Sequence, residues 1–201
     1  MIDNLELIKP FLKFYSEDDY YFLQVLQRKK DRDKIPFGLG GSNNNSRLIR
    51  SYFIKSVDHL EKCYPEIKAM CDLFHARAMI NLNRRSFKGS SLQMMVQLAQ
   101  SIQANNFNNS RMWNNVAGKY NPIKDKLWIL DIDNTSNIPP LMCAFIDHHC
   151  SPVLVDSKIQ AVIPSNSGIH LITSPFNLKE FSLQYPNTEV HKNNPTNLYI
   201  P

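Results

Sequence analysis

Apolar residues recur at helical spacing in several parts of the chain, and these parts predict helices. Residues 5–14 and 18–27 are both predicted to be helical, with Ser16 as the N-cap of the second helix. Residues 47–74 begin as a strand or a helix start and then continue as a helix. Further helices are predicted at residues 90–107, 109–120, 139–150 and 176–185.

After residue 75 the hydrophobic period changes to two. In residues 75–86, small and apolar side chains from Ala76 to Leu82 alternate with polar ones, which predicts a half-buried strand with one polar face. Residues 126–133 are a short and nearly continuous apolar run, which predicts a buried strand. Further strands are predicted at residues 152–157, at 158–173 with a turn inside, at 187–192 and at 196–201.

These elements predict an α+β protein, in which a helical N-terminal half packs on a mixed or antiparallel β-sheet in the C-terminal half. We expect residues 1–75 to be mainly helical and residues 76–201 to form the α+β core, and a length of 201 residues favours one compact unit. Residues 28–46 combine a run of charges with glycine and asparagine, which is typical of a mobile loop.

Composition narrows the class of protein only slightly. The chain is 43% hydrophobic and 20% charged, which is ordinary for a soluble globular protein, and its net charge of +5 is a weak indication of polyanionic partners. Its start carries acidic residues early and predicts no signal peptide, and no stretch is apolar enough to predict a membrane span. The four cysteines have no Cys-x-x-Cys spacing, so we expect reduced thiols in the cytoplasm.

The candidate chemistry begins at the end of the predicted strand 126–133. Asp131 and Asp133 are two residues apart, so on a strand both side chains project from one face while Ile132 points the other way. Two adjacent carboxylates repel each other unless a cation lies between them, and carboxylate oxygens suit Mg²⁺ or Mn²⁺. The alternative is a strand that simply ends in a turn, where aspartate and asparagine are common.

Two later segments carry further candidates. Ser165 and Ser167 offer hydroxyl groups ahead of His170, and together they could cradle a phosphate, although a histidine in an apolar strand is by itself better explained as a core or edge residue. Glu189 begins a short predicted strand and Lys192 follows it. Alone, this glutamate is an ordinary surface residue; beside the aspartates it supplies the acid, and Lys192 the cation, that phosphoryl transfer needs.

The order of these motifs resembles the archaeo-eukaryotic primase and primase-polymerase superfamily. An apolar strand ending in Asp-x-Asp is followed by Ser-Gly-x-His opening a strand, and then by an acid in a short strand. The resemblance implies a core like that of an RNA-recognition motif. It also implies that Asp131, Asp133 and Glu189 are catalytic ligands of divalent metal ions, and that His170 with the nearby serines and Lys192 binds the nucleotide.

The activity that the resemblance implies is addition of nucleotides, dependent on Mg²⁺ or Mn²⁺. The substrates would be NTPs or dNTPs, the template single-stranded DNA or RNA, and replication proteins are among the partners it suggests. Three arginines, Arg77, Arg84 and Arg85, lie in or beside the predicted strand 75–86 and are candidates for a track that binds the template. A solvated sheet edge explains these arginines equally well.

Two other functions are compatible with parts of the sequence. The stretch "LWILDIDNT" also matches the nucleophile motif of haloacid-dehalogenase-like phosphatases, in which Asp131 would attack phosphorus and Asp133 act as acid and base. That family needs a further lysine and a late acidic pair, and no two adjacent acids follow. The non-enzymatic alternative is an accessory protein that binds nucleic acid and keeps a degenerate primase-like fold.

Overall fold

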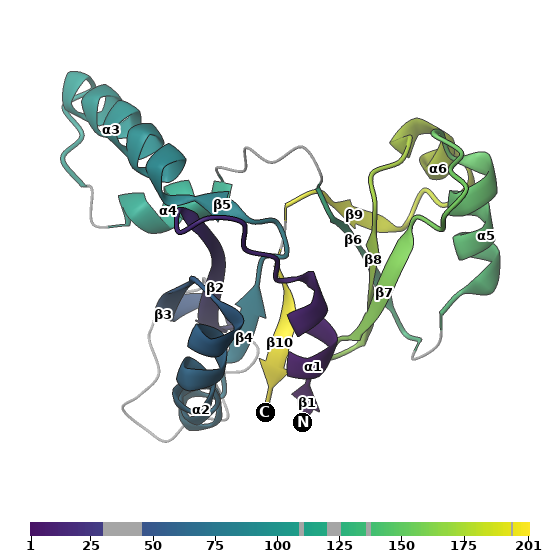
Figure 1. The fold of residues 1–201 in the computed structure, drawn as a ribbon, viewed down its shortest axis with the longest axis horizontal. Coiled ribbons are helices and arrows are strands. Elements are labelled where there is room, and N and C mark those ends of the chain that lie inside the picture. Colours follow the sequence, from purple (N-terminus) through teal and green to yellow (C-terminus); the bar gives the residue numbers. More distant parts are fainter. Residues whose placement is uncertain (30–45, 109–110, 120–125, 136–137, 194) are drawn as a thin grey trace.

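The computed structural model describes residues 1–29, 46–108, 111–119, 126–135, 138–193 and 195–201, and it contains two antiparallel sheets (Figure 1). The predicted loop at residues 28–46 lies almost entirely outside these ranges. The two ends of the chain meet, because β1 (Ile2–Asp3) pairs with β10 (Thr196–Ile200) at one edge of the first sheet.

The first sheet has six strands, and they come from both halves of the chain. Its order is β1, β10, β4 (Arg77–Ile80), β2 (Asp19–Gln27) and β3 (Arg47–Ile54), and β5 (Arg85–Ser86) pairs with the start of β2. A boundary near residue 75 therefore does not divide the chain into two structural units, because strands from both sides of it pair in the first sheet.

The second sheet has four strands, in the order β7 (Ile159–Pro164), β8 (Gly168–Thr173), β6 (Trp128–Asp133) and β9 (Glu189–His191). Its strands alternate between two environments. Leu130 and Leu171 belong to a cluster under helices α5 (Pro140–His149) and α6 (Leu178–Gln184). Ile129 and Ile172 belong to the core that reaches across to the first sheet. The face that carries Ile129 is therefore turned toward the first sheet.

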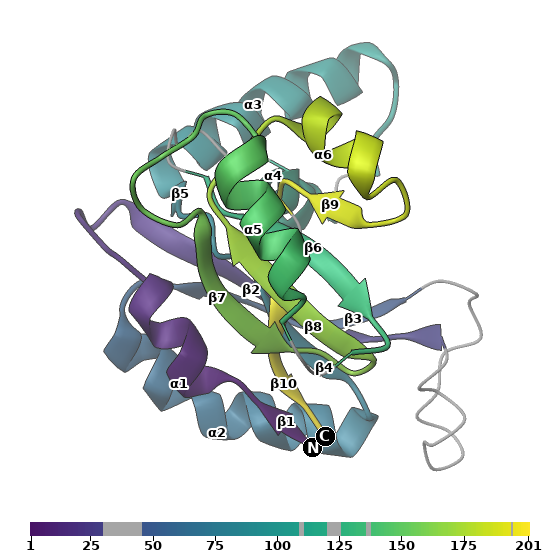
Figure 2. The same cartoon turned by 90° about the vertical axis from the view of Figure 1, so that its right-hand side faces the viewer.

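Helices lie around both sheets (Figures 1 and 2). They are α1 (Leu5–Ile8) with a 3-10 turn at Lys9–Phe11, α2 (Val57–Phe74), α3 (Phe87–Gln103), α4 (Met112–Lys119), α5 (Pro140–His149) and α6 (Leu178–Gln184). Leu60 and Ile67 of α2 are fully buried in the core of the first sheet, and Ile146 of α5 and Phe181 of α6 are fully buried in the cluster on the second.

Two buried asparagines connect the sheets. Asn4 Nδ2 donates to the carbonyl oxygens of Pro164 in β7 and Asn197 in β10, each at 2.9 Å. Asn83 accepts from Leu127 N at 2.7 Å and donates to Leu127 O at 2.9 Å, where the chain crosses into the second sheet. Since a buried amide that loses its partners costs about 1–3 kcal/mol, these bonds help to set the position of one sheet relative to the other.

The predicted helix at residues 18–27 is wrong, because these residues form β2, an interior strand of the first sheet. Both faces of β2 are covered: Tyr20 and Phe22 lie in a small aromatic cluster that includes Ala117 of α4, and Leu23 and Val25 lie in the main core. The sequence of a strand that is buried on both faces is nearly continuously apolar. It therefore lacks the alternation of apolar and polar residues by which a strand is distinguished from a helix.

Two strand predictions also need correction. Residues 152–157 form no strand, and Val153 and Val155 are exposed. The strand in residues 75–86 exists as β4, but it is not half-buried, since Arg77 and Met79 on its polar side are 5% and 8% exposed. All four residues of β4 are buried, so this strand has no solvated face.

The remaining elements are confirmed. The helices predicted at 90–107, 109–120, 139–150 and 176–185 correspond to α3 to α6, and the strands predicted at 126–133, 158–173, 187–192 and 196–201 correspond to β6 to β10. The fold is α+β, as predicted. Among the described residues, no helix is both long enough and apolar enough to cross a membrane.

Candidate functional site

The candidate residues meet on neighbouring strands of the second sheet. β6 lies between β8 and β9, and Asp131 is directly opposite His170 on one side and Glu189 on the other. Residues opposite each other in a ladder project from the same face. That face also carries Ile129 and Ile172, so the three side chains point toward the side of the first sheet, beyond the apolar core.

His170 is the most enclosed member of this group, at 7% exposed. Its Nδ1 is 2.9 Å from Thr196 Oγ1 of β10, and its Nε2 is 3.5 Å from Asp131 Oδ1. Burial lowers the pKa of His170, the Asp131 charge opposes this, and His191 and Arg28 lower the pKa further. A neutral ring with its proton on Nε2 satisfies both contacts, because the threonine hydroxyl can donate to Nδ1 while the carboxylate accepts.

Asp133 is held by the turn between β7 and β8. Ser167 Oγ donates to Asp133 Oδ1 at 2.5 Å, and Asn134 N donates to Ser167 O at 2.7 Å. Ser165 Oγ accepts from Gly168 N at 3.1 Å, so its hydroxyl closes the turn. The predicted phosphate cradle therefore has a different structure: one serine orients Asp133 and the other shapes the turn.

Residue 168 has to be a glycine because the backbone of β6 lies too close for a side chain. A Cβ atom at this position would lie 2.0 Å from Ile132 O and 2.9 Å from Asp133 Cα. The backbone that approaches Gly168 so closely belongs to the strand that carries the aspartates.

Glu189 is more exposed than Asp131. Its side chain is 74% exposed and its Oε2 lies 3.2 Å from His191 Nε2, whereas the Asp131 side chain is 36% exposed. Because Glu189 extends toward His191 and Asp133 toward Ser167, no group of three or more His, Cys, Asp or Glu side chains within the described ranges is gathered closely enough to hold a metal ion. The donors nevertheless fit Mg²⁺ or Mn²⁺ in type, since they are carboxylates on adjacent positions of one face.

The four predicted cationic residues do not join this group. Lys192 Nζ lies 5.0 Å from the centre of the Trp128 ring, and Trp128 packs in the cluster under α5 and α6 on the opposite face of the sheet. Arg84 forms an ion pair with Asp19 at 2.7 Å. Its neighbours in the proposed template track are buried: Arg77 in β4 is 5% exposed and Arg85 is 1% exposed.

Arg85 has a structural role. Its Nη1 donates to Asn83 O at 2.7 Å and its Nη2 to Gly118 O at 3.2 Å, and burial lowers its pKa to about 10. The expectation that Arg77, Arg84 and Arg85 form a surface track for the template is therefore not supported by their positions.

Sequence reasoning missed two residues that contact or influence the site. Thr196 binds His170 across the two sheets, and nothing in its sequence context indicates this. Arg28 follows β2 and is exposed, and its charge acts on His170. It belongs to the charged run at residues 28–32, where the composition indicated only a loop.

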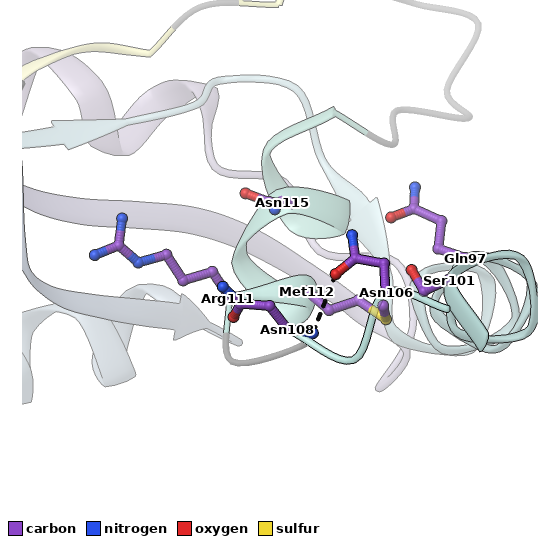
Figure 3. Close-up of a pocket in the computed structure, with 7 residues that line it drawn as sticks. All are labelled: Gln97, Ser101, Asn106, Asn108, Arg111, Met112 and Asn115. Carbon is purple, nitrogen blue, oxygen red and sulfur yellow. Dashed lines mark hydrogen bonds between the residues drawn. The ribbon is translucent and has the colours of Figure 1, made fainter. Parts of the chain in front are cut away.

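A hollow lies away from these strands, between the end of α3 and the start of α4 (Figure 3). It has a volume of about 500 Å³. Its lining is polar except for one methionine and consists of Gln97, Ser101, Asn106, Asn108, Arg111, Met112 and Asn115. None of the residues predicted from sequence lines it.

Comparison of the chain with protein-family models, curated proteins and solved structures finds no match.

Proposed function

We propose that this protein is a nucleotidyltransferase of the primase and primase-polymerase type, with an α+β core of the kind found in that superfamily. The observation that carries the proposal is the register of the second sheet, in which Asp131 is paired with His170 on β8 and with Glu189 on β9. Three motifs that are far apart in the sequence and that together resemble the superfamily's site thus lie at one level of one sheet face.

The acids are the proposed metal ligands. Asp131, Asp133 and Glu189 would hold Mg²⁺ or Mn²⁺ between β6 and β9, with Ser167 orienting Asp133. When bound, the ions supply activation of an attacking hydroxyl group and stabilisation of the leaving pyrophosphate.

His170 and Arg28 are the proposed contacts for the triphosphate. Thr196 fixes the ring of His170 through Nδ1. The other ring nitrogen, Nε2, lies on the side of Asp131, where its N–H group can donate to a phosphate oxygen. Arg28 supplies positive charge near the same ring. Lys192 is not part of this proposal, because it lies over Trp128.

The substrates that follow are NTPs or dNTPs, with single-stranded DNA or RNA as the template and replication proteins as further partners. The net charge of +5 is in keeping with polyanionic ligands. We place the activity in the cytoplasm, in keeping with four cysteines that are all free thiols.

The test is incorporation of labelled nucleotides on single-stranded templates with Mg²⁺ or Mn²⁺, comparing the native chain with Asp131→Asn. We expect incorporation to fall by more than about 100-fold, since even residues that only support metal ligands contribute 10–100-fold. The matched control is Asp156→Asn, which makes the same change at an exposed position outside the site. Equal incorporation by the native chain and Asp131→Asn would remove the catalytic assignment.

The same preparations separate the other two functions. Hydrolysis of an aryl phosphate that is lost in Asp131→Asn would indicate the phosphatase, although Lys192, the lysine that follows Glu189, lies on the opposite sheet face from the aspartates. Salt-sensitive binding of single-stranded DNA without incorporation by the native chain would indicate the accessory protein.

A further inference from the structure

Helix α3 is amphipathic, but its apolar face is exposed and its polar face is turned toward the protein. Six of its apolar residues are exposed, although the apolar stripe of a surface helix ordinarily faces the core. These residues are Leu92, Met95, Val96, Leu98, Ala99 and Ile102, and the five larger ones are 36–64% exposed. At 100° per residue they occupy one continuous face, and they form a larger exposed apolar surface than any other helix presents in the described part of the chain.

The polar side of α3 faces the protein. Ser90 is fully buried and its Oγ lies 2.7 Å from the hydroxyl oxygen of Tyr20. About two and three helical turns further on, Gln97 and Ser101 line the polar hollow against α4 (Figure 3). α3 is thus held by these polar contacts and, at its start, by the ring of Phe87, and its apolar face has no partner among the described residues.

Charge indicates what kind of partner would cover this face. The sequence from Gly89 to Asn108 contains no charged residue. Helices that bind membrane surfaces carry lysine and arginine on the polar side, and helices that select an oppositely charged partner carry charges beside the seam. α3 has glutamine and serine in these places, which neither attract lipid head groups nor repel an identical helix.

The spacing of the apolar residues is symmetric about Gln97. For each apolar residue of the exposed face that lies a given number of positions before Gln97, another apolar residue of that face lies the same number of positions after it. The pairs are Leu92 with Ile102, Met95 with Ala99, and Val96 with Leu98. An antiparallel pair of identical helices with a twofold axis at this level would therefore place apolar residues opposite apolar residues throughout, as a twofold interface requires.

We propose that a second copy of this chain covers the exposed face, through an antiparallel α3–α3 contact centred at Gln97. In Figure 1, α3 projects from the side of the molecule that is remote from the second sheet, so the two copies can approach without contact between their candidate sites. A helix of this length is about 25 Å long. The contact is therefore near the lower end of specific interfaces, at about 1,000 Å², and predicts a dimer whose fraction depends on concentration.

Sedimentation velocity over a concentration series of the full chain tests the proposal. The native chain should pass from monomer to dimer as concentration rises. The double variant Leu92→Glu/Ile102→Glu places like charges opposite each other across an antiparallel pair and should weaken the dimer by at least about 100-fold. Leu92→Glu/Ile102→Lys places opposite charges there and should dimerise more strongly than the first double variant.

The matched control is Leu183→Glu, which introduces the same charge at an 86% exposed leucine of α6 and should leave the dimer unchanged. Circular dichroism verifies that each variant is folded. A native chain that stays monomeric at its highest soluble concentration would overturn the proposal, as would a dimer insensitive to the Glu/Glu variant. Equal behaviour of the two double variants would refute the antiparallel register.

Discussion

Replacing Gly168 with alanine should destabilise the protein more than a change of one methyl group normally does. The added Cβ would lie 2.0 Å from Ile132 O and 2.9 Å from Asp133 Cα, and both atoms belong to the backbone of the neighbouring strand. Non-bonded carbon atoms are in favourable contact at about 3.5–4.0 Å, so β6 and β8 must separate at this point by more than about 1 Å.

The expected cost has two parts. Overfilling a packed site costs about 1–3 kcal/mol. Separating the strands also weakens the pairing of Asp133 with Gly168 and the bond from Asn134 N to Ser167 O, each worth about 1 kcal/mol. We expect a loss of about 3 kcal/mol in the free energy of unfolding, which for a chain of this size lowers Tm by roughly 6–12 °C.

Urea unfolding followed by circular dichroism measures this loss, and Gly118→Ala is the matched control. Gly118 lies in α4, where the nearest atom to an added Cβ is Phe22 Cε1 at 3.9 Å, an ordinary contact. Alanine is the better helix former by up to about 1 kcal/mol, so this variant should be neutral or more stable. If Gly168→Ala unfolds at the same urea concentration as the native chain, the described approach of β6 and β8 is wrong.

Two further predictions concern helix α2. His75 ends this helix in the left-handed conformation, at φ 43° and ψ 48°, so His75→Gly should raise the free energy of unfolding by about 0.5–1 kcal/mol. The control His148→Gly, inside α5, should lower it. A lower free energy of unfolding in both variants would contradict the left-handed conformation of His75. Burial, helped by the charge of Asp72, raises the pKa of the Cys71 thiol to about 12, so iodoacetamide at mildly alkaline pH should modify the partly exposed Cys63 well before Cys71. Equal modification of the two thiols in the folded protein, measured by mass spectrometry of peptides, would contradict this prediction.

The sequence predicted the second sheet better than the first because turn residues bound its short strands, whereas β2 lies in a longer apolar run. Each strand of the second sheet places alternate residues on different sides, and its strands are joined through short turns or helices, so local patterns suffice. β2 of the first sheet is buried on both faces and pairs with β4. Local sequence carries no information about such pairing, and an apolar run of this kind is as compatible with a helix as with a strand.

Roles that depend on a partner distant in the chain were the hardest to predict. Arg85 has the residue type of a phosphate contact, but its guanidinium binds the carbonyl oxygens of Asn83 and Gly118. Ser167 has the residue type of a phosphate ligand, but its hydroxyl binds Asp133. Residue type and spacing specify what a side chain can do, and the tertiary fold determines which of its options is used.

The register of β6 connects the fold to the candidate site. Because side chains alternate along a strand, a shift by one residue would turn Asp131 and Asp133 into the apolar cluster under α5 and α6, and would turn Leu130 and Ile132 out of it. The apolar residues of β6 therefore exclude the shifted register by their burial alone. Gly168 allows the start of β8 to approach Asp133, and Ser167 then reaches its carboxylate. The packing that stabilises the second sheet is thus the same packing that places the acids beside His170, and this is why substitutions at Gly168 should affect stability and the proposed activity together.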